Sequence, residues 1–176
     1  MEYYGFTNTA MLDGGLVSYR EIKAPLESVN SIPVKDGNFQ VSINHALSVD
    51  MSGVKNAIGS ADMLDARPPE FYFGVNQQIV LDKAGHIPGA KSYFWRYSFD
   101  GDLLKNKDEL RKILIEGMQL NPQKPMITYC TGGLETSMNF FVLHRILGFE
   151  NIRLYDASMK EWANDATTPM MQYRWE

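Results

Sequence analysis

The segment from residue 125 to residue 147 constrains the fold more than any other part of this 176-residue chain. Residues 125–129, Pro-Met-Ile-Thr-Tyr, have the pattern of a short buried strand, and residues 137–147 have the pattern of a helix. The glycine-rich turn between them carries Cys130, the only cysteine in the sequence. A lone cysteine is more often a small buried hydrophobe, but at a helix N-terminus unpaired N–H groups and the helix dipole favour an anion. This position therefore predicts a reactive thiolate.

The remaining segments predict strands that alternate with helices. Further strands are expected over residues 39–43 and 61–65, and a final strand–helix unit closes the chain. Helices are predicted over residues 50–58, 67–74, 107–117 and 137–147. Such alternation favours an α/β fold with a parallel sheet covered by helices on both faces. Ligands of such sheets bind beyond the carboxyl ends of the strands, where Cys130 is placed.

The composition excludes several classes of protein. A hydrophobic fraction of 44% and a charged fraction of 22% are typical of a globular protein, and the length suits one domain with an extension. The net charge of −4 gives no reason to expect nucleic acid or an anionic membrane as a partner. No apolar run is long enough to cross a bilayer, and no His, Cys or carboxylate spacing indicates a metal site. One cysteine cannot form an internal disulfide, so the compartment stays open.

Two stretches of the chain are similar to each other at a constant offset. Residues 5–19 align with residues 148–162, and both predict a turn, a short strand, a second turn and a helix. The identical pairs are Gly5 and Gly148, Phe6 and Phe149, Asn8 and Asn151, and Asp13 and Asp156. We interpret residues 1–24 as the tail of a preceding, similar domain. Residues 25–38, with Pro25, Pro33 and Gly37, are interpreted as a linker.

Four stretches together resemble the rhodanese (sulfurtransferase) family. They are residues 64–71 (Leu-Asp-Ala-Arg-Pro-Pro-Glu-Phe), residues 84–90 (Ala-Gly-His-Ile-Pro-Gly-Ala), the Cys130 loop, and residues 147–162. The resemblance implies a three-layer sandwich with a parallel sheet and helices on both faces. It makes residues 39–169 the catalytic domain, leaves residues 170–176 as a C-terminal tail, and implies a preceding rhodanese-like domain as a partner in the full-length protein.

The resemblance also implies a reaction through a persulfide on Cys130, with no cofactor and no metal. The sulfur donor would be thiosulfate, mercaptopyruvate or a persulfide, and the acceptor a thiol or cyanide. The residues expected to bind the persulfide are Thr131, Gly132, Gly133, Leu134, Glu135, Thr136 and Ser137. We expect both glycines to take positive φ, and Thr136 or Ser137 to cap the helix and donate a hydroxyl to the sulfur. The supporting residues Asp65 and Arg67 either orient the loop or form a plain ion pair.

Two acidic residues depart from the family pattern. Glu70 stands where two-domain thiosulfate and mercaptopyruvate enzymes carry an arginine, and Glu135 is the only charge in the loop. Glu135 would repel an anionic donor and disfavour the thiolate. The loop has six residues if it ends at Glu135 and seven if it ends at Thr136. The longer form resembles a phosphatase-like branch, whose phosphate-binding arginine is missing here. The alternative function is a binding or sulfur-carrier domain with little activity on small donors.

Overall fold

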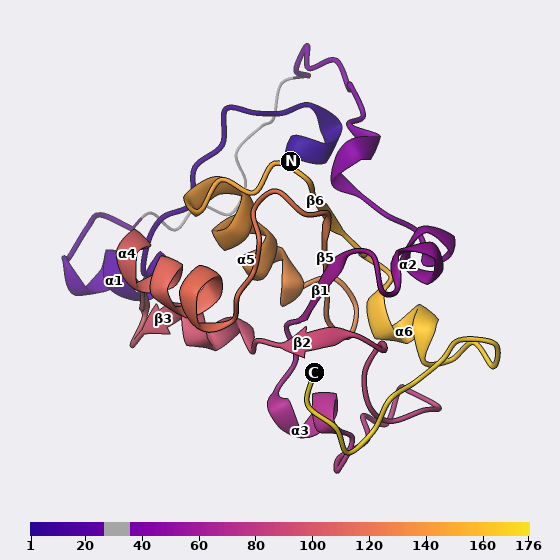
Figure 1. Ribbon diagram of the computed structural model, residues 1–176. Helices are drawn as coiled ribbons and strands as arrows, with labels where there is room; N and C mark the ends of the chain where they lie inside the picture. The colour runs from indigo at the N-terminus through magenta and orange to yellow at the C-terminus, as the bar shows by residue number, and fades with distance from the viewer. Residues whose placement is uncertain (27–35) are drawn as a thin grey trace.

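A four-stranded parallel sheet organises the protein, seen in a computed structural model that describes residues 1–26 and 36–176 (Figure 1). The strand order is β2-β1-β5-β6, and every pairing in this sheet is parallel. The strands are β1 (Asp62–Asp65), β2 (Ala90–Ser92), β5 (Met126–Tyr129) and β6 (Ile152–Leu154). A separate antiparallel pair joins β3 (Phe99–Asp100) to β4 (Leu103–Leu104). The predicted parallel sheet is confirmed.

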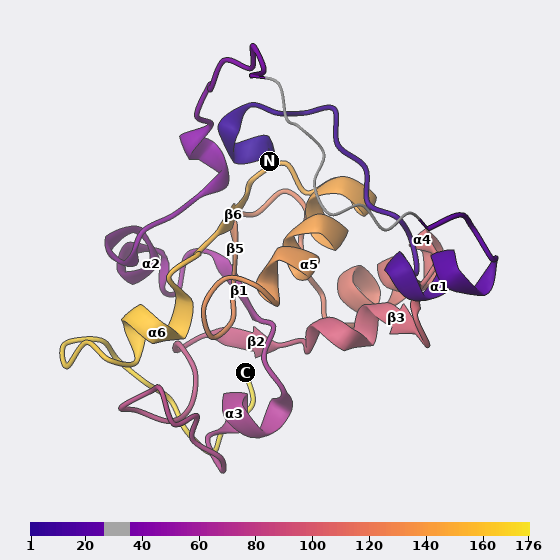
Figure 2. The same cartoon turned by 180° about the vertical axis from the view of Figure 1, so that it is seen from behind.

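Helices cover both faces of this sheet. Figure 1 shows α2 (Met51–Ala57) and α6 (Ser158–Trp162) on one side, and α4 (Lys107–Arg111) and α5 (Thr136–Phe141) on the other. The remaining helices are α1 (Gly15–Glu21), α3 (Pro69–Phe73) and the short 3₁₀ turns η1 (Glu2–Tyr4), η2 (His45–Leu47) and η3 (Trp95–Ser98). Helices α4 and α5 continue as π-type turns over Lys112–Gly117 and Val142–Ile146. The three-layer arrangement expected from the sequence is therefore present (Figure 2).

The alternation of side chains along the strands divides the core into two clusters. Met63 and Ile127 point into the cluster beneath α2 and α6, whereas Leu64 and Met126 point into the cluster beneath α4 and α5. Successive side chains of a strand face opposite sides of the sheet, so a strand buried on both faces is mostly apolar. All four residues of β5 are buried. This double burial fixes the end of β5, and with it the position of Cys130.

Helix boundaries follow the signals in the sequence. The Asp50 side chain accepts a 2.8 Å hydrogen bond from the Gly53 amide and caps α2. Gly74, with φ of 84°, ends α3 in the left-handed conformation that glycine adopts most readily. Asn106 and Glu109 form a capping box at the start of α4. The predicted helices over residues 50–58, 67–74 and 107–117 are confirmed, with shifts of a few residues at their ends.

Two predicted strands are wrong. Residues 39–43 alternate apolar and polar side chains, but no strand among the described residues pairs with them, and Phe39, Val41 and Ile43 stay exposed. The first contact with the sheet edge comes later, at a bridge between Ser48 and Leu154. The short strand expected within residues 5–19 is also absent, although the helix predicted after it is present as α1. An alternating pattern needs a partner strand before it becomes part of a sheet.

The N-terminal segment lies at the periphery of the domain (Figures 1 and 2). Neither η1 nor α1 contains a buried residue, and the segment exposes Met11, Leu12, Leu16, Val17 and Ile22. The Asp13 carboxylate accepts a 2.9 Å hydrogen bond from the Leu104 amide and attaches this segment to β4. The predicted linker 25–38 falls largely outside the described residues, so the division at residues 24 and 38 stays a prediction.

The C-terminal residues pack against α3. The Tyr173 amide donates to the Phe73 carbonyl at 2.8 Å, and Trp175 stacks on Tyr72 and Phe73 with ring centroids 5.4 and 4.9 Å apart. Among the described residues, no helix is long and apolar enough to cross a membrane.

Candidate active site

Cys130 lies directly after β5 and is almost completely buried, with 1% of its surface exposed. Helix α5 begins at Thr136, so the loop from Cys130 ends at Glu135 and has six residues. Three hydrogen bonds attach this loop to the start of α6. The Cys130 amide donates to Ser158 Oγ at 3.1 Å, and the amides of Met159 and Lys160 donate to the carbonyls of Cys130 and Thr131 at 3.1 and 2.8 Å.

The amides that follow Cys130 are free of protein partners. From Thr131 to Thr136, no backbone N–H donates a hydrogen bond to any residue in the part of the chain that the structure describes. Backbone N–H groups are obligatory donors, and leaving one buried without a partner costs about 1–3 kcal/mol. Six consecutive free amides at a helix N-terminus provide the donors that an anion requires. This array lies beside the one cysteine of the chain.

Only one of the two loop glycines has the predicted conformation. Gly133 has φ of 88°, and a Cβ there would lie 2.3 Å from Asp156 Oδ1, so glycine is required at this position. The expectation for Gly132 is wrong, because its φ is not positive. The space beside Gly132 is occupied instead by Lys160, whose Cδ and Nζ would lie 3.2 and 3.6 Å from a Cβ.

The predicted helix caps are also wrong. Helix α5 starts one residue earlier than expected, its N-cap is Glu135, and no side chain caps it. Thr136 is fully buried and shares a 2.5 Å hydrogen bond with the hydroxyl of Thr128. The Ser137 hydroxyl donates to the Leu134 carbonyl at 2.6 Å, and the Leu134 side chain is 84% exposed. Both hydroxyls are therefore engaged away from the sulfur.

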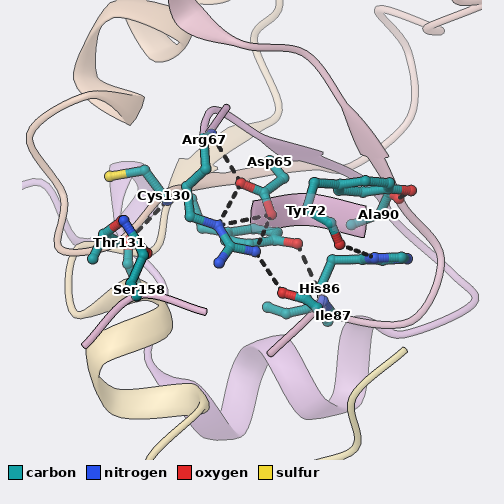
Figure 3. A network of polar contacts seen from close by, with 12 residues as sticks. Asp65, Arg67, Tyr72, His86, Ile87, Ala90, Cys130, Thr131 and Ser158 are labelled. Carbon is teal, nitrogen blue, oxygen red and sulfur yellow. Dashed lines mark hydrogen bonds and ion pairs between the residues drawn. The ribbon is translucent and has the colours of Figure 1, made fainter. Parts of the chain in front are cut away.

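A buried ion pair lies beneath the loop. Arg67 Nη2 is 2.6 Å from Asp65 Oδ2 and donates to the Gly85 carbonyl at 2.7 Å, and neither side chain is more than 1% exposed. Burial lowers the pKa of Arg67, but the Asp65 carboxylate, with smaller contributions from Tyr129 and Cys130, raises it above its ordinary value. Figure 3 shows Arg67 beside Cys130, whose sulfur points away from Asp65.

The contacts of Asp65 decide between its two proposed roles. Its carboxylate accepts from the amide, Nε and Nη2 of Arg67, and it bonds to no loop residue among those described. The plain ion pair therefore describes it better than direct orientation of the loop. Tyr129 completes this layer, since its hydroxyl accepts a 3.2 Å hydrogen bond from the Ile87 amide. We call Asp65, Arg67 and Tyr129 the floor of the site.

A protein-family model, the rhodanese-like domain, matches residues 50–165. The chain belongs to this family. A putative thiosulfate sulfurtransferase from Synechococcus elongatus is 30% identical over 173 residues, which cover 93% of this chain and 53% of the relative. The sulfur carrier protein TtuD from Thermus thermophilus is 28% identical over 96% of this chain and 63% of its own length.

A solved structure gives the same assignment. SseA from Escherichia coli, described as a 3-mercaptopyruvate sulfotransferase, is 27% identical with a TM-score of 0.75, over 89% of this chain and 58% of SseA. The resemblance found in the sequence and the α/β fold expected from it are both confirmed. The rhodanese-like chain spans about half to two thirds of the length of these relatives.

The rim of the rhodanese-like loop contains residues that the sequence did not single out for the site. Thr131 Oγ1 donates to Gln78 Oε1 at 2.8 Å, and the Trp95 side chain is near enough to Glu135 to affect the pKa of its carboxyl. Burial, and then the charge of Asp65, raise the pKa of Glu135, and the Trp95 side chain and Arg67 partly offset this rise. The sequence could have indicated Ser158 and Lys160 as site residues, because they follow β6, the parallel neighbour of β5. Gln78 had none.

Other features of the site are structural. Since the Tyr72 carbonyl can only accept, His86 Nδ1 is the nitrogen that donates to it at 2.8 Å, and the imidazole stacks on the Tyr72 ring. Burial lowers the pKa of His86, and its Nε2 has no partner among the described residues. Within residues 1–26 and 36–176, no cluster of three His, Cys, Asp or Glu side chains is arranged to hold a metal ion.

Proposed function

We propose that the protein is a sulfurtransferase that carries sulfur as a persulfide on Cys130. The observation that supports this most strongly is the run of free amides from Thr131 to Thr136 beside the only cysteine. A persulfide anion carries its charge on the outer sulfur, so it needs several donors that are already in place. Relatives named as thiosulfate sulfurtransferases add support at the level of the family.

The proposed reaction has two nucleophilic steps. The Cys130 thiolate attacks the outer sulfur of the donor, a new sulfur–sulfur bond forms, and the bond between that sulfur and the rest of the donor breaks with its electron pair leaving on the donor. A thiolate or cyanide then attacks the outer sulfur of the Cys130 persulfide. The second bond breaks toward Cys130, which returns to the thiolate. Each step transfers one neutral sulfur atom, so no oxidant or reductant takes part.

The surrounding residues have separate proposed roles. The amides of residues 131–136 bind the charge of the persulfide, and Gly133 lets the backbone turn toward it. Asp65 and Arg67 lie beneath the loop as a buried pair whose net charge is zero. Ser158 positions Cys130 through its amide, because Ser158 Oγ accepts that hydrogen bond and donates one of 2.7 Å to the Tyr155 carbonyl.

The test is transfer of sulfur to the protein from defined donors. After incubation with thiosulfate, mercaptopyruvate or a small persulfide, we expect a mass gain of about 32 Da, one sulfur atom, on the peptide that contains Cys130. The Cys130→Ser variant should fold normally and gain no mass. Sulfur transfer that persists in this variant, or the absence of any gain with all three donors, would overturn the proposal.

A second candidate function is that of a sulfur-carrier domain with little activity on small donors. Glu135 favours it, because an ionised carboxylate at the rim opposes the approach of an anionic donor. The 28% identity to TtuD, a sulfur carrier protein, is consistent with it. The two candidates differ in their donors. A carrier would gain sulfur from a persulfidated protein much faster than from thiosulfate, whereas an enzyme would turn over with the small molecule.

We also propose that a preceding rhodanese-like domain covers the N-terminal segment in the full-length protein. The support is the row of exposed apolar side chains on residues 11–22, together with relatives that are longer than this chain. Burial of apolar surface stabilises such a contact by about 25 cal/mol per Å². Fusion to the longer protein should therefore protect the amides of α1 from hydrogen exchange, and unchanged exchange would contradict the contact.

A further inference from the structure

A cavity of about 640 Å³ lies between the N-terminal segment and α5, apart from the sulfur site. One wall comes from η1, which lies beside the edge strand β6 in both views (Figures 1 and 2). The other walls come from η2, α5 and the end of β6. None of the described residues 130–135 lines it, so the cavity is distinct from the loop around Cys130. Its volume lies in the range of about 300–1,000 Å³ in which proteins bind small molecules.

The cavity offers a ligand an apolar wall that includes three aromatic rings. The side chains of this wall are Tyr3, Tyr4, Leu47, Phe140 and Leu154. The rings of Tyr3 and Tyr4 meet edge to face, with centroids 5.1 Å apart. Backbone hydrogen bonds of 2.7 and 3.0 Å from residues 44 and 42 to the carbonyls of these tyrosines hold η1 in place. Aliphatic and aromatic side chains bind an apolar group, and aromatic faces also attract a cation.

Asp156 gives the cavity a negative charge that has no partner. The residue is exposed, and its side chain occupies the space that a Cβ on Gly133 would need. Among the described residues, no cation comes within 4.0 Å of its carboxylate, and this includes Lys160 and the α-amino group of Met1. The other acidic side chain in the wall differs, because Glu2 forms an ion pair with Arg145.

Ser137 provides a second acceptor in the same cavity. Its hydroxyl donates to the Leu134 carbonyl at 2.6 Å, which uses its proton and leaves the lone pairs of Oγ able to accept. A carboxylate and this hydroxyl oxygen both accept, so a matching ligand has to donate hydrogen bonds. Because Ser137 contacts Leu134 and Asp156 contacts Gly133, a ligand that binds both lies directly behind the Cys130 loop.

From these groups we infer that the cavity is a second binding site, for a small protonated amine with an apolar body. The ammonium group donates to Asp156 and to Ser137 Oγ, and the apolar body packs against Tyr3, Tyr4 and Phe140. An anion of the same shape is repelled by Asp156. The inference does not depend on the proposed reaction, since the amine does not contact Cys130.

Four probes separate the charge of the ligand from its apolar body. They are phenethylamine, 2-phenylethanol, which replaces the ammonium group by a hydroxyl, 3-phenylpropanoate, which is an anion, and methylamine, which lacks the apolar body. Affinities are measured from the NMR shifts of the amides of Tyr3, Tyr4, Ser137 and Asp156. We expect phenethylamine to bind at least about fivefold more tightly than each of the other three, the size expected for one partly exposed charge contact.

Two variants test the groups that form the site. Asp156→Asn should bind phenethylamine no better than 2-phenylethanol, and Phe140→Leu, which does not touch the loop, should weaken phenethylamine about threefold. The matched control is Asp102→Asn, because Asp102 is an exposed carboxylate without an ion pair in the described part of the chain and lies between β3 and β4. This control should bind as the unchanged protein does.

The Cys130→Ser variant separates the cavity from the sulfur site. It should bind phenethylamine with unchanged affinity, whether or not the protein gains sulfur from any donor. A loss of affinity in Cys130→Ser would place the ligand at the sulfur and overturn the inference. Equal affinity for phenethylamine and 2-phenylethanol, no shift of the cavity amides, or equal losses in Asp156→Asn and Asp102→Asn would also overturn it.

Discussion

The floor and the loop of the site differ in how their polar groups are satisfied. In the floor, the Asp65 carboxylate accepts bonds from Arg67 through its amide, Nε and Nη2, and Tyr129 accepts from Ile87. In the loop, six consecutive amides have no partner among the described residues. The two layers meet at Cys130, directly after β5.

This difference indicates that the floor and the loop have different roles. A floor in which each charged group has its partner is rigid and has little further capacity to bind a ligand. A loop with free donors is costly in the empty protein, and that cost is recovered when an anion binds. The floor and the loop therefore contribute differently, since the buried pair of the floor is satisfied within itself whereas the loop amides remain free for a ligand.

The largest expected effect comes from breaking the floor. Asp65→Asn leaves the Arg67 charge buried without its carboxylate, and we expect a loss of about 3–5 kcal/mol in the free energy of unfolding, measured in urea. The matched control is Arg111→Met, because the Arg111–Glu116 pair is about 60% exposed on both sides and should contribute less than about 1 kcal/mol. Equal losses in the two variants would remove the distinction between floor and surface.

A smaller loss is expected when a side chain is added to the loop. Gly133→Ala combines a positive φ with a contact of 2.3 Å to Asp156 Oδ1, and should cost about 1–3 kcal/mol. The double variant with Asp156→Ala removes the nearest atom and should recover part of the loss, measured as a double-mutant cycle in urea. Stability unchanged in Gly133→Ala would show that the loop has other conformations available.

The two hydroxyl residues at the start of α5, Thr136 and Ser137, should differ in how much they stabilise the protein. Thr136→Val removes one partner of a buried hydrogen bond with Thr128, and we expect a loss of about 1–3 kcal/mol by thermal unfolding. Ser137→Ala removes an exposed hydroxyl and should change stability by less than about 0.5 kcal/mol. The reverse order would mean that Ser137 is the residue that holds the start of α5.

The smallest effect is a pH dependence at the rim. Because the pKa of Glu135 is raised by burial, the carboxylate becomes neutral at a higher pH than usual and its repulsion of thiosulfate declines as the pH falls. Thiosulfate should load Glu135→Gln several-fold faster than the unchanged protein near pH 7, and the ratio should approach one as the pH falls through the raised pKa. A ratio that does not vary with pH would exclude Glu135 from donor selection.

The sequence predicted the elements that depend on neighbouring residues. A lone cysteine between a buried strand and a helix, the helix predicted from residue 50 and the helix predicted to end at residue 74 all rest on local signals, and each is present. The rim depends on residues that are distant in the chain. Ser158 and Gln78 contact the loop from 28 and 53 residues away, and only the strand order brings them there.

The errors have the same origin. Residues 39–43 have the alternation of a strand, but a strand forms only where a second one is available to pair with it. The cap expected from Thr136 or Ser137 is absent, because Thr128, eight residues earlier, holds the Thr136 hydroxyl in the core and the Ser137 hydroxyl donates to the Leu134 carbonyl. Local pattern shows which residues can form an element, and the tertiary partners decide whether they do.

The most direct test of the account is the state of the loop amides when Cys130 carries the persulfide. With ¹⁵N-labelled protein, amide proton shifts of residues 131–136 are compared before and after loading with sulfur. The account predicts that these amide protons move downfield together, as expected for donors to an anion, while the floor amides of Asp65 and Arg67 stay unchanged. A loaded protein in which only the Cys130 signal moves would contradict it.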